Sequence, residues 1–238
     1  MSYGLYVATA GAVARQNQLD VVSNNLANAN TPGYRSVDVG FQEVLAEEQA
    51  PDRHLVALAE TRVDPRPGPL TSTGNPLDLS LEGRGYFALQ GAPGVPVLTR
   101  TVSLKVDESG LLSDQRGRPV MVDGAELHVD PARAVEVTAE GEVTQSGQVL
   151  GRLSLYDVGN GGGLSPLGDG LYTPNDGSGP VFEVGAKVLT GTTEGSNVET
   201  VGTMVKMIRL ERDHQSLMKV IQAYREADEG LIAAGRKP

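Results

Sequence analysis

The sequence lacks cysteine and tryptophan, and it contains only seven tyrosines and three phenylalanines among 238 residues. Without cysteine the chain has no disulfide framework, no thiolate nucleophile and no thiolate zinc site. No segment approaches the ~18 consecutive apolar residues of a membrane-spanning helix, so we expect no membrane insertion. The first 20 residues lack the charged start and continuous apolar block of a cleavable secretory signal, because Arg15 is their first charged residue.

The signatures of common enzymes and metal sites are missing as well. The sequence has no Gly-x-Ser-x-Gly elbow, no His-Glu-x-x-His pair and no phosphate-binding loop ending in Gly-Lys-Ser/Thr. Its three histidines, His54, His128 and His214, have no second ligand at metal-binding spacing. We therefore predict that the protein is not an enzyme and that it uses no metal or other cofactor.

Negative charge is concentrated in the middle of the chain, whose formal net charge is −10 overall. Residues 36–196 hold eleven basic and twenty-three acidic side chains, whereas residues 1–35 and 197–238 each hold one more basic than acidic side chain. An acidic middle repels nucleic acid, and near-neutral ends can pack closely against copies of themselves. The charge pattern argues against a nucleic-acid partner and favours contacts through the two ends.

Apolar residues recur at helical spacing at both ends of the chain. Near the N-terminus they follow a heptad pattern with Arg15 in its one polar slot, and near the C-terminus their face changes phase across residues 211–216. These positions are Leu5, Ala8, Ala12, Leu19, Val22 and Leu26 at one end, and Val198, Val201, Val205, Ile208, Leu210, Leu217, Ile221, Tyr224 and Leu231 at the other. Such narrow faces cannot be buried within one helix, so we expect the helices to pack on each other or on neighbouring subunits.

Turn and cap signals predict where these helices begin and end. Four asparagines within residues 24–30 disfavour a helix interior, and Thr-Pro-Gly-Tyr at 31–34 is typical of a turn, so the first helix should end near residue 29. Ser196 followed by Glu199 matches a capping box and predicts a helix from 196. Gly235, followed by a basic pair and proline, predicts its end.

Between the helices, short alternating apolar segments are separated by turn signals every ~8–12 residues, which is typical of antiparallel strands. Residues 159–179 contain eight glycines and predict a long loop. The expected fold class is α+β, with a discontinuous, coiled-coil-like pair of terminal helices and a central, mainly antiparallel β domain. We expect a helical domain formed by residues 1–34 and 196–238, an extended linker at 35–75 and a β domain at 76–195.

Several segments resemble one protein family. Residues 18–35, which read QLDVVSNNLANANTPGYR, closely resemble the N-terminal signature of the bacterial flagellar axial proteins, the rod and hook family. Residues 194–198 (EGSNV) and 204–208 (MVKMI) resemble the C-terminal helix motif of that family. Residues 81–89, 98–100 and 107–112 resemble the β domain of its longer members. A single β region of this size resembles a rod subunit, and the departure from the family pattern at residues 211–216 looks more like a proximal than a distal one.

The resemblance implies a structural subunit of the basal-body rod that assembles with itself and with other rod subunits. It also implies recognition by the flagellar export apparatus, export without a cleavable signal peptide, and a periplasmic location with the helices inside and the β domain outside. The residues expected at subunit contacts are Leu5, Ala12, Leu19, Val22, Asn24, Asn25, Leu26, Asn28, Asn30, Thr31, Gly33, Tyr34, Ser196, Asn197, Val198, Val201, Met204, Val205, Met207, Ile208, Leu217 and Ile221.

Two functions of other classes stay open at this point. The β domain could bind or act on peptidoglycan, with the helices only as an anchor, although the few aromatic residues disfavour a stacking site for sugars. The glycine- and aspartate-rich segment at 159–177 is also compatible with a calcium-dependent surface protein, although its spacing matches no EF-hand or nonapeptide repeat.

Overall fold

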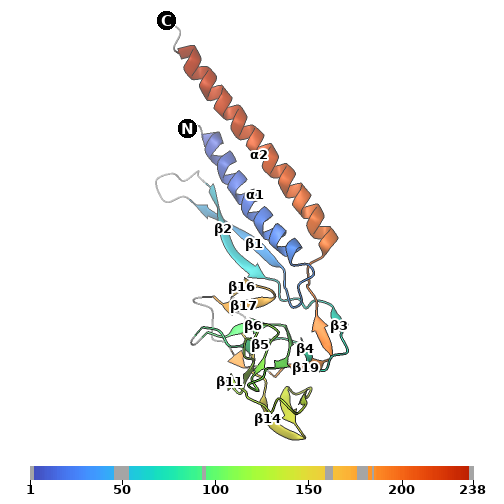
Figure 1. The fold of residues 1–238 in the computed structure, drawn as a ribbon. Helices are drawn as coiled ribbons and strands as arrows, with labels where there is room; N and C mark the ends of the chain where they lie inside the picture. Colours follow the sequence, from blue (N-terminus) through green and yellow to red (C-terminus); the bar gives the residue numbers. More distant parts are fainter. Residues whose placement is uncertain are drawn as a thin grey trace. The chain divides into compact units, whose positions relative to one another are not determined.

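The computed structural model of the protein describes residues 3–45, 54–92, 95–158, 163–175, 182–183 and 185–235. The chain divides into two compact units (Figure 1). The helical unit comprises Met1–Ala27, Val37–Arg62 and Glu199–Pro238, and the β unit comprises Asn28–Ser36 and Val63–Val198. The asparagine turn thus groups with the strands, while residues 37–62, expected within a linker, group with the helices.

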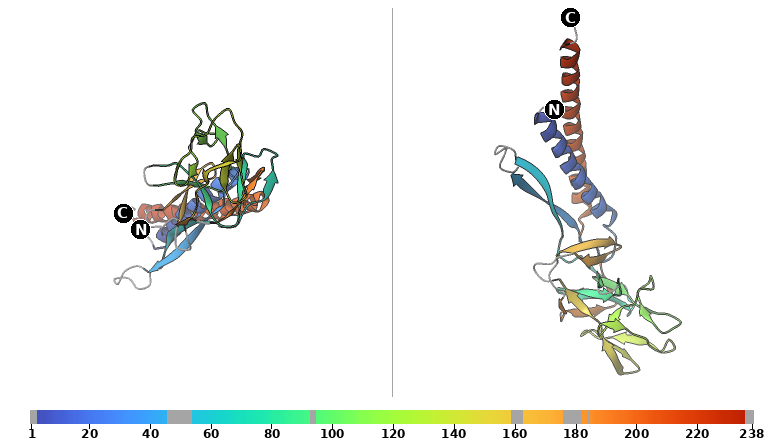
Figure 2. Two further views of the ribbon diagram at one scale, coloured as in Figure 1. Left: turned by 90° about the horizontal axis from the view of Figure 1, so that it is seen from below. Right: turned by 90° about the vertical axis from the view of Figure 1, so that its left-hand side faces the viewer.

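The helical unit contains α1 (Tyr3–Ala27), α2 (Thr200–Gly235), β1 (Val37–Leu45) and most of β2 (His54–Val63). Strands β1 and β2 form a two-stranded sheet, and α1 lies alongside α2 in antiparallel orientation (Figure 2). Alanine-rich α1 ends two residues before the expected position, and α2 ends at Gly235 as predicted. The predicted capping box is wrong, because α2 begins at Thr200 and the hydroxyl of Ser196 accepts from the N–H of Val198 (3.2 Å).

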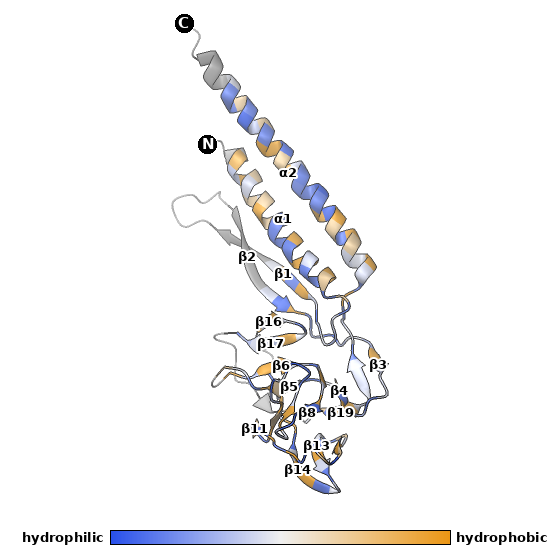
Figure 3. Cartoon of the chain, in the orientation of Figure 1, coloured by the Kyte–Doolittle hydropathy of each residue, from blue (hydrophilic) through white to orange (hydrophobic). Residues whose placement is uncertain are grey.

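Small residues of α1 pack against larger residues of α2. Ala8, Ala12 and Ile221 are buried together, with Leu5 and Leu217 against them. A Cβ atom on Gly4 would lie 2.4 Å from the hydroxyl oxygen of Tyr224, so glycine permits this close approach. Hydrophobic and hydrophilic residues are mixed along the described parts of both helices (Figure 3).

The β unit consists of short antiparallel strands. A six-stranded sheet has the order β16-β17-β6-β5-β15-β18, and three-stranded sheets have the orders β19-β4-β7 and β12-β13-β14. Two-stranded pairs are β20-β3, β10-β11 and β8-β9. The strands are β3 (Leu70–Ser72), β4 (Asp78–Glu82), β5 (Tyr86–Leu89), β6 (Val97–Thr99), β7 (Thr101–Ser103), β8 (Lys105–Val106), β9 (Leu112–Ser113), β10 (Met121–Val122), β11 (Ala125–Glu126), β12 (Val135–Val137), β13 (Glu142–Gln145), β14 (Gln148–Arg152), β15 (Leu155–Asp157), β16 (Leu164–Gly168), β17 (Leu171–Pro174), β18 (Phe182–Glu183), β19 (Lys187–Thr190) and β20 (Thr192–Glu194).

Part of the glycine-rich segment forms a hairpin where a loop was expected. Strands β16 and β17 pair across Asp169 and Gly170, whose φ angles are 54° and 71°. Two consecutive residues with positive φ match the twist of a tight hairpin, and the short polar side chain of aspartate tolerates that conformation. The prediction of a long loop is therefore wrong for residues 164–174, while residues 159–162 and 176–180 lie outside the described residues.

The β unit has a large apolar core. Its main cluster consists mostly of buried leucines and valines of the sheets, and it includes Leu79, Phe87, Leu112, Val143 and Leu153. The predicted α+β class with terminal helices and an antiparallel β region is confirmed. None of the helices within the described ranges is long and apolar enough to cross a membrane.

Candidate assembly surfaces

The asparagine turn is held within the β unit by its own backbone and by strand β20. The carbonyl of Asn28 accepts from the N–H of Thr31 (3.1 Å), and the Thr31 hydroxyl donates to the Asn28 side chain (3.1 Å). The N–H of Gly33 donates to the carbonyl of Glu194 (2.7 Å). Segments from the two ends of the sequence are therefore joined at this turn.

Two glycines make the turn compact. Gly33 has a φ of 71°, and a Cβ atom there would lie 3.2 Å from the Thr101 methyl group. Gly170, also at 71°, comes so near that its Cβ atom would lie 2.3 Å from the carbonyl oxygen of Pro32. Alanine at 170 would combine an unfavourable backbone angle with a direct clash, so the close approach of the β16–β17 hairpin to the turn requires glycine at 170.

Glu194 is the centre of a buried ionic network. One of its carboxylate oxygens accepts from Arg100 Nε at 2.9 Å, and the other lies 3.4 Å from Arg35 Nη2 and 3.2 Å from the N–H of Gly68. Arg100 also donates to the carbonyls of Gly85 and, at 2.9 Å, Leu81. The side chains of Arg100 and Glu194 are 0% and 1% exposed. Both arginines share the one carboxylate, and Arg100 also donates to backbone carbonyls, so the network tolerates burial, but loss of Glu194 would leave two buried cations without their anion.

Two tyrosines, Tyr172 and Tyr86, contact the residues of this network. The Tyr172 hydroxyl accepts from the backbone N–H of Arg35 (2.6 Å) and donates to the carbonyl of Gly33 (3.2 Å). The guanidinium groups of Arg35 and Arg100 lie over the Tyr86 ring, 5.5 and 5.7 Å from its centroid.

Burial shifts the pKa values of Arg100 and of the tyrosines Tyr34, Tyr86 and Tyr172. It raises the pKa of Tyr34 to about 12, and it raises the pKa values of Tyr86 and Tyr172 above their ordinary value. Burial also lowers the pKa of Arg100, which Glu194 partly opposes. The three tyrosines are therefore neutral at physiological pH and serve as hydrogen-bonding and packing groups.

Beside the turn, the side chains of two asparagines form hydrogen bonds with backbone N–H and C=O groups. The Asn25 amide donates to the carbonyl of Val37 (2.8 Å) and accepts from its N–H (2.9 Å), as a neighbouring strand would. The Asn197 amide accepts from the N–H of Ser36 (2.6 Å) and donates to the carbonyl of Arg66 (2.8 Å). Both were expected at subunit contacts, and the structure places both in contacts within the chain.

The expected contact residues fall into three groups of burial. Ala12, Val22, Asn25, Gly33, Tyr34 and Ile221 are buried. Leu5, Leu19, Leu26, Asn28, Thr31, Ser196, Asn197, Val198, Met207 and Leu217 are half-buried. Asn24, Asn30, Val201, Met204, Val205 and Ile208 are exposed.

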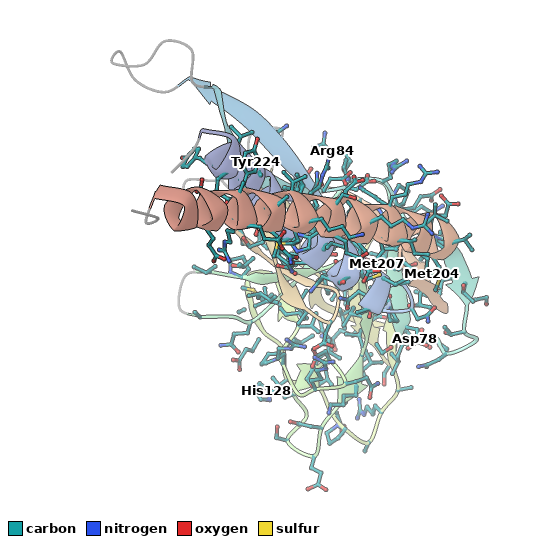
Figure 4. The ribbon with its side chains drawn as sticks, turned by 90° about the horizontal axis from the view of Figure 1, so that it is seen from above. Asp78, Arg84, His128, Met204, Met207 and Tyr224 are labelled. Carbon is teal, nitrogen blue, oxygen red and sulfur yellow. The ribbon has the colours of Figure 1, made fainter. Side chains whose placement is uncertain are left out.

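The change of phase along α2 separates a packed face from an exposed one. Leu210, Leu217 and Ile221 face α1, and between them a ring nitrogen of His214 lies 3.3 Å from the carbonyl oxygen of Ala12. Val201, Met204, Val205 and Ile208 share the opposite face at spacings of three and four residues, and they are 71, 46, 44 and 50% exposed. Figure 4 shows Met204 and Tyr224 towards opposite ends of α2. We call these four residues the apolar stripe.

The sequence patterns did not indicate the residues of the ionic network. Arg35, Arg100 and Glu194 belong to the segments that resemble the family, yet only apolar and turn residues were selected there. One signal was available, because Arg100 stands between two short apolar strands in a stretch otherwise free of charge. Its ion partner is 94 residues away, which no local pattern indicates. Among the described residues, no group of three or more acidic, histidine or cysteine side chains could hold a metal ion.

Comparison with known proteins relates both ends of the chain to the same family. The model "Flagella basal body rod protein" matches residues 5–35, and "Flagellar basal body rod FlgEFG protein C-terminal" matches residues 189–233. The chain is 32% identical to the basal-body rod protein FlgF of Escherichia coli, over 94% of each chain. It is 29% identical to FlgF of Mesorhizobium japonicum over the whole of both chains. It is also 30% identical to the rod protein FlgG of Agrobacterium fabrum, over 91% of this chain and 93% of that protein.

Proposed function

Since the chain belongs to the flagellar basal-body rod protein family, we propose that it is a proximal rod subunit that polymerises helically through its terminal helices. Members of this family are structural rod components that assemble with other rod components, and they are not enzymes. The proximal type is favoured because FlgF proteins from several bacteria match at 29 to 32% identity over most of the chain. The departure at residues 211–216 supports the same choice.

One observation carries the proposal of polymerisation. The helical unit leaves an apolar stripe open to solvent, on the face of α2 that does not contact α1. Its buried cluster is small, so the helices gain further stabilisation by covering exposed apolar residues with neighbouring subunits. The half-buried residues Leu19 and Leu26 provide additional apolar surface for such contacts.

The proposed location is the periplasmic rod, which the protein reaches through the flagellar export apparatus. Excess negative charge in the middle of the sequence suits a solvated outer position for the β unit, and near-neutral helices suit a packed inner layer. Helical packing of the coiled-coil kind in the assembled rod is part of the same proposal.

The proposal is tested by Leu19→Asp in a cell that assembles flagella. Burying an unpaired carboxylate costs far more than the leucine contact contributes, so we expect the variant to keep a folded β unit but to be absent from purified basal bodies, with loss of motility. Val149→Asp adds the same charge at a position of β14 that is 54% exposed, and it should assemble normally. Normal motility of the Leu19→Asp cells would contradict the role of the helices in assembly.

A distal rod subunit is the second candidate, supported by the 30% identity to FlgG. The two candidates differ in position along the rod. A label fused to a loop of the β unit should appear in the proximal part of the rod in a basal-body reconstruction. A label along the distal part would favour the second candidate.

A further inference from the structure

The helical unit has a second exposed apolar surface besides the stripe. A groove of about 760 Å³ runs between α1 and α2, with Gly4, Gly11 and Ala14 of α1 and Val220 and Tyr224 of α2 among its lining residues. Small side chains on α1 make the groove deep, and Val7 on its wall is 48% exposed. Its shape suits a helix that presents medium-sized apolar side chains.

The apolar stripe presents such side chains on a helix, but it cannot contact the groove of its own chain. The stripe is centred near residue 204 and the α2 wall of the groove near residue 220, which places them roughly 24 Å apart along one continuous helix at ~1.5 Å per residue. They also lie on different faces of α2, since the groove adjoins the packed face that contains Leu217 and Ile221. Only another molecule can bring the two surfaces together.

Charge does not oppose this contact. Residues 3–14 and 200–205 contain no acidic or basic side chain. Lys206, within the stripe segment, lies 3.3 Å from Asp38, and Arg15, in the groove wall, donates to Gln18 at 2.7 Å and lies 3.7 Å from Asp213. These two cations are already engaged within the chain, and Arg209 and Arg212, which follow the stripe, are exposed, so their charged ends can stay in solvent at the edge of the contact.

We propose that the groove of one molecule receives the apolar stripe of a second copy of this chain. The inference rests on the proposed function and names the two surfaces that meet. Because they are different patches, the contact is head-to-tail, and each added copy presents a new free groove or stripe. If the two copies are parallel, each is displaced by roughly 24 Å along the helix axis relative to the last.

The first test uses three variants of the purified full chain in sedimentation experiments. Val7→Asp in the groove and Val205→Asp in the stripe should each weaken self-association by at least about tenfold. Val13→Asp is the matched control, because Val13 is 56% exposed on α1 and does not line the groove. Wild-type chains that stay monomeric at all concentrations, or an equal defect in all three variants, would refute the proposal.

Mixing the two defective variants gives a sharper result. A Val7→Asp chain keeps its stripe and a Val205→Asp chain keeps its groove, so an equimolar mixture should form a dimer that grows no further. A contact between identical patches would leave the mixture monomeric, and that result would overturn the head-to-tail arrangement.

A cross-linking experiment separates this inference from the proposed function. The chain has no cysteine, so a Val7→Cys, Val205→Cys double variant has only the two introduced thiols. In purified basal bodies, oxidation should yield a ladder of linked subunits, and the Val13→Cys, Val205→Cys control should yield none. If the double variant is incorporated into basal bodies but yields no ladder, only the groove contact is refuted. If even the unmodified chain is absent from basal bodies, the proposed function is refuted.

Discussion

The two units of this chain differ in how far their apolar and charged side chains are buried. The β unit buries a large apolar cluster and also buries charged groups, each of which finds a partner in the same unit, as Arg100 does with Glu194. Among the side chains whose burial the structure describes, the helical unit has a small cluster around Ala8, Ala12 and Ile221, and it exposes valine, methionine and isoleucine along α2. The contrast indicates that the β unit is stable alone, while the helical unit depends on neighbours for part of its stability.

The largest effect expected from this comparison is in the β unit. Glu194→Ala should lower its free energy of unfolding by roughly 3–5 kcal/mol, because Arg35 and Arg100 would stay buried without their carboxylate. Urea unfolding followed by tyrosine fluorescence measures the change. Glu82→Ala is the control, since the side chains of Glu82 and its partner Lys187 are both 60% exposed, and that change should stay within about 0.5 kcal/mol. Equal effects would show that the network contributes no more than a surface ion pair.

A smaller effect is expected in the helical unit. Ile221→Ala removes the largest side chain of its buried cluster and should destabilise the helix pair by about 2 kcal/mol, measured by circular dichroism at a concentration where the chain is monomeric. The transition of the β unit should not move.

Ile208→Ala provides the matched change in the stripe. Ile208 is 50% exposed, so its replacement should alter the stability of the monomer by less than about 0.5 kcal/mol. A large loss on Ile208→Ala in the monomer would mean that the stripe already packs within the chain, which would remove the contrast between the units.

A further difference between the units appears only at high pH. Burial raises the pKa of Tyr34 to about 12 and raises those of Tyr86 and Tyr172, compared with about 10 in an unfolded chain. The folded β unit therefore holds protons that the unfolded chain releases, so its stability is constant below about pH 10 and falls as the pH rises towards 12. Titration by ultraviolet absorbance should show these tyrosines ionising together with unfolding. Their ionisation in a fully folded β unit would contradict the burial.

The sequence predicted the elements that depend on local patterns. Heptad spacing predicted α1 and α2, and asparagine, proline and glycine signals placed the end of α1 within two residues. The predicted start of α2 was wrong because the Ser196 hydroxyl accepts a hydrogen bond from Val198, two residues further on, and does not cap a helix. The β16–β17 hairpin was missed because its glycines also fit a loop, and only its approach to Pro32 shows why residue 170 is glycine.

The contacts that join distant parts of the sequence could not be predicted in this way. Arg35 and Arg100 meet Glu194 across separations that no periodicity encodes, and Asn25 and Asn197 were expected at subunit contacts although both complete backbone hydrogen bonding within the chain. The stripe shows the opposite case. Its apolar spacing was visible in the sequence, but only the structure shows that Val201, Val205 and Ile208 face away from α1.

The hydrogen bond between Gly33 and Glu194 has a consequence for how this chain can change. It joins two points that are distant in the sequence, and the strands of the β unit, from residue 64 onward, lie between them, as do β1 and most of β2 of the helical unit. Loops within residues 64–193 can be lengthened, shortened or replaced without moving Gly33 and Glu194 relative to each other. The loops of the β unit can therefore differ between related subunits while the distance between those two points stays constant.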